Sequence, residues 1–201
     1  MPSTDRLLKR CGTRLGLSAI IGGLACGATA ALATMTVRLD LPQVVSAAER
    51  AFVGRVVSVR SERDQAGLPS TWVTFAVDQV IKGHIGSELT MKQFGTATPL
   101  SDGSVIRLPG LPSYVPGEEM VIFLSAESEA GFCSPIGLAQ GKFPIMRKGG
   151  GPATVTATVE NLGVLQSMRS LQAPRTPLAT EITLNDFLDH VAQLVAQRAS
   201  H

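Results

Sequence analysis

One cysteine and three histidines are the side chains best suited to nucleophilic chemistry beyond residue 33 of this sequence. Cys133 lies in Gly-Phe-Cys-Ser-Pro, and a thiol enzyme needs a histidine to hold its cysteine as thiolate. His84 falls in a turn, His190 between apolar positions near the end of the chain, and His201 at the last residue. None stands in a cysteine-hydrolase signature, so we expect no catalytic residue. A thiol-dependent enzyme using Cys133, with His84 as its base, is the alternative.

Metal and phosphate sites lack their usual patterns. The sequence contains no HExxH, no CxxC and no pair of histidines at helical spacing. The acidic pairs Glu118-Glu119 and Glu127/Glu129 flank a turn and lie in a polar loop, which is typical of solvated faces. The glycines at 149–151 do not join a strand to a helix, so they predict a turn rather than a phosphate loop. We therefore expect no metal and no cofactor.

The first 33 residues have the order of a bacterial-type secretory signal. A basic segment at 6–14 is followed by an uncharged, mainly apolar one at 15–32, and the stretch ends in the small-x-small triplet Ala31-Leu32-Ala33. Cleavage after Ala33 predicts a secreted or periplasmic protein. Two alternatives stay open: a lipoprotein anchored at Cys26, which has small residues around it, and an uncleaved membrane anchor.

Removal of this leader changes the charge and the cysteine content. The leader holds four of the 18 Lys and Arg and one of the 16 Asp and Glu, which leaves 14 and 15. This near-neutral balance gives no reason to expect nucleic acid as a partner. Aromatic residues make up only 4% of the chain, which argues against a stacking platform for bases or sugars. Cys133 is then the only cysteine, so no internal disulfide is possible.

Residues 34–164 predict one β-rich domain. Asp40 before Leu-Pro can cap a short helix over 43–50. Between the strands we expect loops at 61–70 and 95–115, the latter with at most a short strand at 105–108. Apolar alternation and short apolar runs between turn signals predict strands at 51–60, 71–81, 87–94, 120–125, 138–146 and 153–160, the last two as a hairpin.

Residues 165–201 predict a linker and a C-terminal amphipathic helix. The linker, 165–180, contains two prolines. Thr183 and Asp186 resemble a capping box at the start of the helix. An apolar stripe at three- and four-residue steps follows, formed by Leu184, Phe187, Leu188, Val191, Leu194 and Val195. We expect this stripe to dock on the domain itself. Short strands with one helix at each end predict a small antiparallel barrel or sandwich.

Several blocks taken together resemble a group of exported bacterial proteins with a netrin-like, OB-type barrel. This fold is related to that of the tissue inhibitors of metalloproteinases. The matching blocks are AAERAFVGRVVS at 47–58, VDQVIKG at 77–83, PGEEMVIFL at 116–124, GLAQGKF at 137–143 and the helix at 184–191. The resemblance implies a small antiparallel closed barrel. It also implies a protein partner, most specifically a secreted zinc protease.

The resemblance does not extend to the zinc-chelating mechanism of those inhibitors. They bind the protease zinc through an N-terminal cysteine locked by disulfides, whereas the mature end expected here is Thr34. The sequence therefore predicts an exported, non-enzymatic β-barrel module that binds a protein partner. A thiol enzyme using Cys133 and a structural envelope lipoprotein anchored at Cys26 are the alternatives.

Overall fold

The computed structural model describes residues 37–170 and 181–199. The leader, with the processing residues Ala31 and Ala33 and the lipidation candidate Cys26, lies outside the described residues, as does His201. Among the described helices, none is long and apolar enough to span a membrane.

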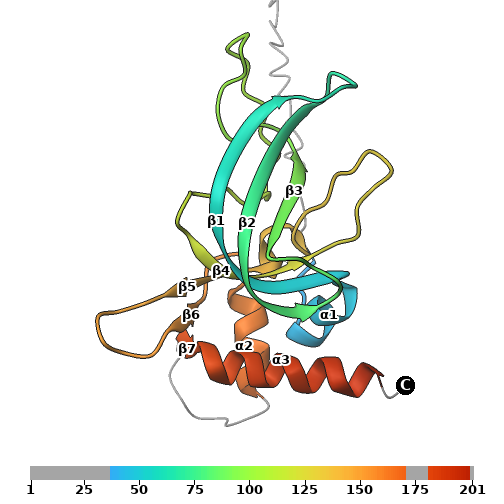
Figure 1. Cartoon of the computed structure of the whole chain (residues 1–201). Helices are drawn as coiled ribbons and strands as arrows, with labels where there is room; N and C mark the ends of the chain where they lie inside the picture. Colours follow the sequence, from blue (N-terminus) through green and yellow to red (C-terminus); the bar gives the residue numbers. More distant parts are fainter. Residues whose placement is uncertain (1–36, 171–180, 200–201) are drawn as a thin grey trace, which may run out of the picture. The chain divides into compact units, whose positions relative to one another are not determined.

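Seven antiparallel strands form one sheet in the order β3-β2-β1-β4-β5-β6-β7 (Figure 1). The strands are β1 Arg50–Arg63, β2 Pro69–Lys82, β3 Glu88–Phe94, β4 Glu119–Leu124, β5 Lys142–Met146, β6 Thr154–Thr156 and β7 Glu181–Thr183. The helices are α1 Leu41–Ala47, α2 Leu162–Ser170, α3 Leu184–Ala199 and the short 3₁₀ helix η1 Leu138–Gly141.

The prediction of a mainly antiparallel β domain is confirmed, but the sheet is not closed into a barrel. Strands β3 and β7 stand at opposite ends of the strand order and do not pair with each other. The long hairpin of β1 and β2 curls away from the rest of the sheet, as Figure 1 shows. The closed barrel expected from the sequence is therefore replaced by an open, strongly curved sheet.

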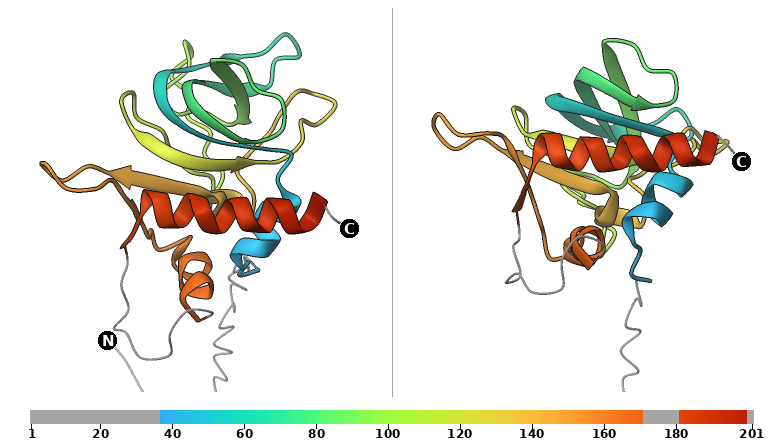
Figure 2. Two further views of the ribbon diagram at one scale, coloured as in Figure 1. Left: turned by 60° about the horizontal axis from the view of Figure 1, so that its bottom comes forward. Right: turned by 90° about the horizontal axis from the view of Figure 1, so that it is seen from below.

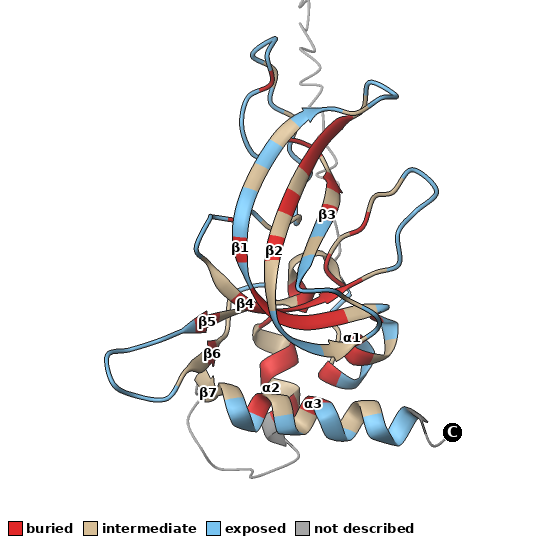
Figure 3. Ribbon diagram, viewed as in Figure 1, coloured by how far each residue is buried: buried red, intermediate tan, exposed pale blue. Residues whose placement is uncertain are grey.

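Two apolar cores lie on opposite sides of β4, which is buried on both faces (Figure 3). Val121 and Phe123 point into a core shared with the three helices, which we call the helical core. Met120 and Ile122 point into a core enclosed by β1, β2 and β3, which we call the sheet core. A strand that is buried on both faces has a continuous run of apolar residues in its sequence. Such a run predicted the strand at 120–125.

The C-terminal helix α3 docks on the domain as the sequence predicted. Figure 2 shows α3 lying along one side of the sheet, with α1 and α2 next to it. Phe187 and Val191 are completely buried in the helical core. At the start of the helix, the Asp186 backbone N–H donates to the Thr183 hydroxyl at 3.2 Å. The hydroxyl in turn donates to the Asp186 carboxylate at 2.6 Å, so the predicted cap is confirmed.

The predicted cap residue Asp40 and the lysine of the VDQVIKG block hold the two ends of α1. Asp40 and Gln43 form a capping box at its start. At its end, the Lys82 ammonium donates to the Val45 carbonyl oxygen at 3.0 Å and to that of Ala48. Burial, and then the Arg198 guanidinium, lowers the pKa of Lys82. The lysine of the VDQVIKG block thus caps a helix, where a cation also opposes the helix dipole.

Strands β1 and β2 extend into the predicted loop at 61–70, and β7 was not predicted. Three further segments differ from their predicted structure. Residues 138–141 form a 3₁₀ helix instead of a strand, because Gly137 and Leu138 both adopt positive φ and turn the chain. The strand predicted over 153–160 shortens to β6, because the Asn161 side chain accepts from the Thr158 backbone N–H at 2.6 Å and turns the chain into α2. Helix α2 occupies the first part of the predicted linker, and buries an apolar face in the helical core.

Candidate binding pocket

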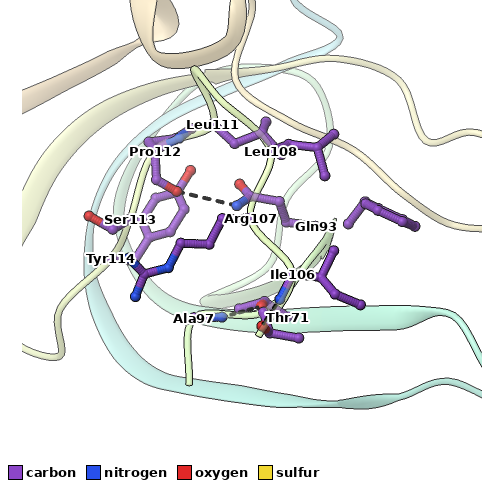
Figure 4. A pocket seen from close by; sticks show the side chains of 12 residues that line it. Thr71, Gln93, Ala97, Ile106, Arg107, Leu108, Leu111, Pro112, Ser113 and Tyr114 are labelled. Carbon is purple, nitrogen blue, oxygen red and sulfur yellow. Dashed lines mark hydrogen bonds between the residues drawn. The ribbon is translucent and has the colours of Figure 1, made fainter. Parts of the chain in front are cut away.

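A cavity of about 430 Å³ opens between strands β2 and β3 and the loop at 95–115 (Figure 4). The structure confirms this long loop, which contains neither a helix nor a strand. The lining residues are Thr71, Gln93, Phe94, Thr96, Ala97, Ile106, Arg107, Leu108, Leu111, Pro112, Ser113 and Tyr114. We call this cavity the Tyr114 pocket.

The base of the loop is fixed to the end of the β2–β3 hairpin. The Thr71 hydroxyl donates to the Gly95 carbonyl oxygen at 2.8 Å. Across the loop, the Thr96 backbone N–H donates to the Ile106 carbonyl oxygen at 2.7 Å, and the Ile106 N–H donates to the Thr96 hydroxyl at 2.9 Å. These bonds set the position of Arg107 and of the apolar residues that follow it, so the pocket is largely preformed.

Two buried polar side chains line the pocket, and each has one buried atom with no hydrogen-bond partner among the described residues. Gln93 is 8% exposed and Tyr114 6% exposed. The Gln93 amide donates through Nε2 to the Pro112 carbonyl oxygen at 3.2 Å, which leaves its Oε1 unpaired. The Tyr114 hydroxyl is also unpaired. Burial raises the pKa of Tyr114, so the phenol is neutral and its O–H can donate a hydrogen bond to a ligand acceptor.

Packing and one half-buried ion pair hold the Tyr114 ring in place. Phe75 meets it edge to face, with ring centroids 5.8 Å apart. The Lys142 ammonium lies 4.8 Å from the centre of the Tyr114 ring and donates to the Ser113 carbonyl oxygen at 2.7 Å. Glu118 pairs with Lys142 at 2.7 Å. The PGEEMVIFL and GLAQGKF blocks therefore meet at Tyr114, and Glu118 is an ion-pair partner rather than the solvated residue that we predicted.

The remaining walls combine a cation with apolar side chains. Arg107 extends along the pocket in Figure 4 and is exposed, while none of the 12 lining residues is acidic. Leu108 and Leu111 border the same space. Taken together, the pocket offers a neutral donor, a neutral acceptor, a positive charge and apolar surface. This arrangement can bind a partly apolar, negatively charged ligand.

We expect Tyr114→Phe to leave the unligated protein at least as stable as the wild type. A buried polar group without a partner costs about 1–3 kcal/mol, and the substitution removes the hydroxyl while keeping the ring and its contact with Phe75. Urea unfolding followed by the fluorescence of Trp72, the only tryptophan, measures the effect. Tyr114→Ala is the contrasting variant and should lose about 3–5 kcal/mol. A comparable loss in Tyr114→Phe would mean that the hydroxyl is already paired.

Cys133 borders a second, more open cavity of about 420 Å³, which shares Gln93, Phe94, Leu108 and Leu111 with the Tyr114 pocket. It is buried, and its sulfur lies 3.7 Å from the Arg50 guanidinium, which pairs with Glu127 at 2.8 Å. Burial raises the pKa of the Cys133 thiol and outweighs the effect of Arg50. No histidine lines this cavity. The structure therefore does not form the thiolate site that the alternative prediction requires.

We expect Cys133 to resist a thiol reagent in the folded protein. A raised pKa keeps the sulfur protonated at neutral pH, and the thiolate is the reactive form. With Ellman's reagent at pH 7.5, release of the chromophore should be at least about 100-fold slower in buffer than in 6 M guanidinium chloride. Cys133→Ser supplies the blank. Equal rates in both conditions would show an accessible, activated thiol and would support the enzyme hypothesis.

The other predicted candidates are not brought together. His84 is exposed, and His190 is half-buried on α3, beyond the helical core. Within residues 37–170 and 181–199, no three His, Cys, Asp or Glu side chains lie close enough together to hold a metal ion. No sequence motif marks Gln93, Arg107 or Tyr114. The only signals were the length of the loop at 95–115 and the presence of a single tyrosine in the chain.

Comparison of the chain with protein-family models, with curated proteins and with solved structures finds no match.

Proposed function

We propose that the protein is an exported, non-enzymatic β module that binds a protein partner, and that the Tyr114 pocket holds a part of this partner. One observation carries the proposal: two side chains that line one cavity are more than nine-tenths buried, and each has a polar atom with no hydrogen-bond partner among the described residues. Such atoms are costly unless a bound molecule or solvent completes their hydrogen bonds. A site that keeps them in place is therefore best explained by ligand binding.

The surface around the pocket favours a protein as the partner. Val105, Leu108 and Val115 are 46%, 42% and 63% exposed, and all three lie on the loop that forms the pocket. Leu108 lines the pocket itself, and exposed apolar side chains near a cavity are typical of protein–protein contact surfaces. A small hydrophilic ligand would need no exposed apolar side chains on this loop.

The proposal includes a netrin-like relationship for the fold. Phe132 makes an isolated bridge to Lys92 on β3, and Pro135 makes one to Leu124 at the end of β4, beyond the residues of β4 that pair with β5. The Cys133 backbone N–H donates to the Lys92 carbonyl oxygen at 2.9 Å, and the Ile136 N–H to that of Phe123 at 2.9 Å. In the proposed relationship, the segment at 132–136 would correspond to the closing strand of an OB-type barrel. A secreted zinc protease, the partner implied by the sequence resemblance, is accordingly the first candidate.

A capture experiment with matched variants tests the proposal. The immobilised wild-type protein should enrich one defined protein from the culture fluid of its host. Tyr114→Phe should enrich it at least tenfold less, although the fold is unchanged. Lys148→Ala, a surface variant outside the pocket, should behave as the wild type. Recovery of no protein, or equal recovery with Tyr114→Phe, would contradict the proposal.

The nature of the partner and the form of the N-terminus are tested separately. If the captured protein is a zinc protease, its peptide-cleaving activity should be titrated by the wild-type protein and not by Tyr114→Phe. Intact-mass analysis of the exported protein distinguishes a start at Thr34 from the lipidated Cys26 of the lipoprotein alternative. A start at Thr34 agrees with a secreted or periplasmic module.

A further inference from the structure

We propose that the Tyr114 pocket recognises the C-terminal residue of a polypeptide, with its free carboxylate, its amide N–H and an apolar side chain. This inference rests on the proposed function, because it names the part of the protein partner that enters the pocket. It is argued from the hydrogen-bonding capacity, the charge and the walls of the pocket.

A ligand that pairs with both unpaired atoms must carry an acceptor and a donor. The neutral Tyr114 hydroxyl can donate to a carboxylate oxygen, and Gln93 Oε1 can accept only from an N–H or O–H group. Because Gln93 Nε2 is already bound to the Pro112 carbonyl oxygen, the orientation of the amide is set. An inorganic anion without protons would leave Gln93 Oε1 unpaired. The last residue of a peptide carries the two required groups on one Cα.

The charge of the pocket favours a free carboxylate over a neutral chain segment. Arg107 is the only formally charged residue among those that line the pocket, and no acidic side chain opposes it there. Hydrogen bonds from a guanidinium to a carboxylate are about twice as strong as those between neutral groups. A free amino acid fits less well, because its ammonium group would bring a second positive charge close to Arg107. Acylation of the nitrogen, as in a peptide, removes this repulsion.

The walls favour an apolar side chain on the terminal residue. Phe94, Ile106, Leu108 and Leu111 contribute carbon surface to a cavity of about 430 Å³. This volume lies within the range of about 300–1,000 Å³ that is common for ligand pockets, toward its lower end. It suits one large residue and its flanking peptide unit rather than a folded element. The exposed Leu108 and Val105 would then contact the residues that precede the C-terminus.

The single tyrosine of the chain allows a direct test in the whole protein. Incorporation of 3-fluorotyrosine places one ¹⁹F probe at position 114. N-acetyl-Ala-Ala-Leu with a free carboxylate should shift this resonance saturably. The same peptide with a C-terminal amide should bind at least tenfold more weakly, because it loses the charge that pairs with Arg107. Arg107→Gln should reduce the preference for the acid over the amide to less than threefold.

Each outcome separates this inference from the proposed function. Equal binding of acid and amide, or no shift with either peptide, would overturn the inference. If the captured partner depends on Tyr114 but keeps its affinity after its last residue is removed, the proposed function stands and the inference is wrong. If the free-acid peptide binds and no protein is captured, the pocket assignment stands and the proposed function is wrong.

Discussion

Phe187→Ala is expected to lower the free energy of unfolding by about 3–5 kcal/mol, because it removes a large buried ring and leaves a cavity. Phe187 is completely buried on α3. Its ring centre lies 5.0 Å from that of Phe143 and 6.5 Å from that of Phe123. The three rings join α3 to β4 and β5, so their loss weakens the attachment of the whole helix. Domains of this size are stable by only about 5–15 kcal/mol, so the loss is a large fraction.

Guanidinium unfolding followed by circular dichroism measures the effect of Phe187→Ala. Gln193→Ala is the matched control, because Gln193 is exposed on the same helix and its loss should change stability by less than about 0.5 kcal/mol. If Phe187→Ala is too unstable to purify, Phe187→Leu should show a smaller loss of about 1–2 kcal/mol. A loss below about 1 kcal/mol in Phe187→Ala would contradict a docked C-terminal helix and would favour a helix that binds a partner.

Local signals explain the parts of the fold that the sequence predicted correctly. Asp40 and Thr183 cap helices through bonds to residues three positions away, so both caps are visible in a short window. Gly83 and Gly117 adopt positive φ at the turns that their neighbours indicate. Strand β4 is apolar on both sides because two cores meet there, and its run of apolar residues needs no long-range information.

Long-range contacts explain the parts that were wrong. Residues 138–141 follow a turn signal and begin the predicted strand, but the Gln140 side chain is buried and binds the backbone of residues 37–39. Its Oε1 accepts from the Leu39 N–H at 2.9 Å, and its Nε2 donates to the Val37 carbonyl oxygen at 2.9 Å. These partners lie about 100 positions earlier in the chain. A local pattern cannot show such a contact, so it predicted a strand in place of η1.

The candidate site was missed for the same reason. Gln93 lies near the end of β3 and Tyr114 near the end of the loop at 95–115, and each is unremarkable within its own segment. The pocket exists because the Gln93 amide binds the Pro112 carbonyl oxygen and because Lys142 lies over the Tyr114 ring. Both contacts depend on the relative positions of β3, β5 and the loop at 95–115. The sequence drew attention to Cys133 because a thiol is a common nucleophile. The surroundings of Cys133 in the fold are not visible in the sequence.

Gly141→Ala is expected to destabilise the protein by about 3 kcal/mol, although it adds a single methyl group. A Cβ atom at this position would lie 2.8 Å from the Ile136 backbone nitrogen and 2.9 Å from the Phe123 carbonyl oxygen. These two atoms are joined by a hydrogen bond of 2.9 Å, so the methyl group would push against a bonded pair of backbones. Unlike the end of a flexible side chain, this pair cannot move without separating residues 132–136 from β4.

The same geometry gives Gly141→Ala a matched control and a functional consequence. Gly149 has no atom within 4 Å of a Cβ and no positive φ, so Gly149→Ala should stay within about 0.5 kcal/mol of the wild type. Thermal unfolding followed by circular dichroism compares the two variants. Because Lys142 follows Gly141 directly and fixes Tyr114, the displaced backbone should also weaken peptide binding at 114. Equal melting temperatures for Gly141→Ala and Gly149→Ala would show that the two backbones do not cross as closely as the structure indicates.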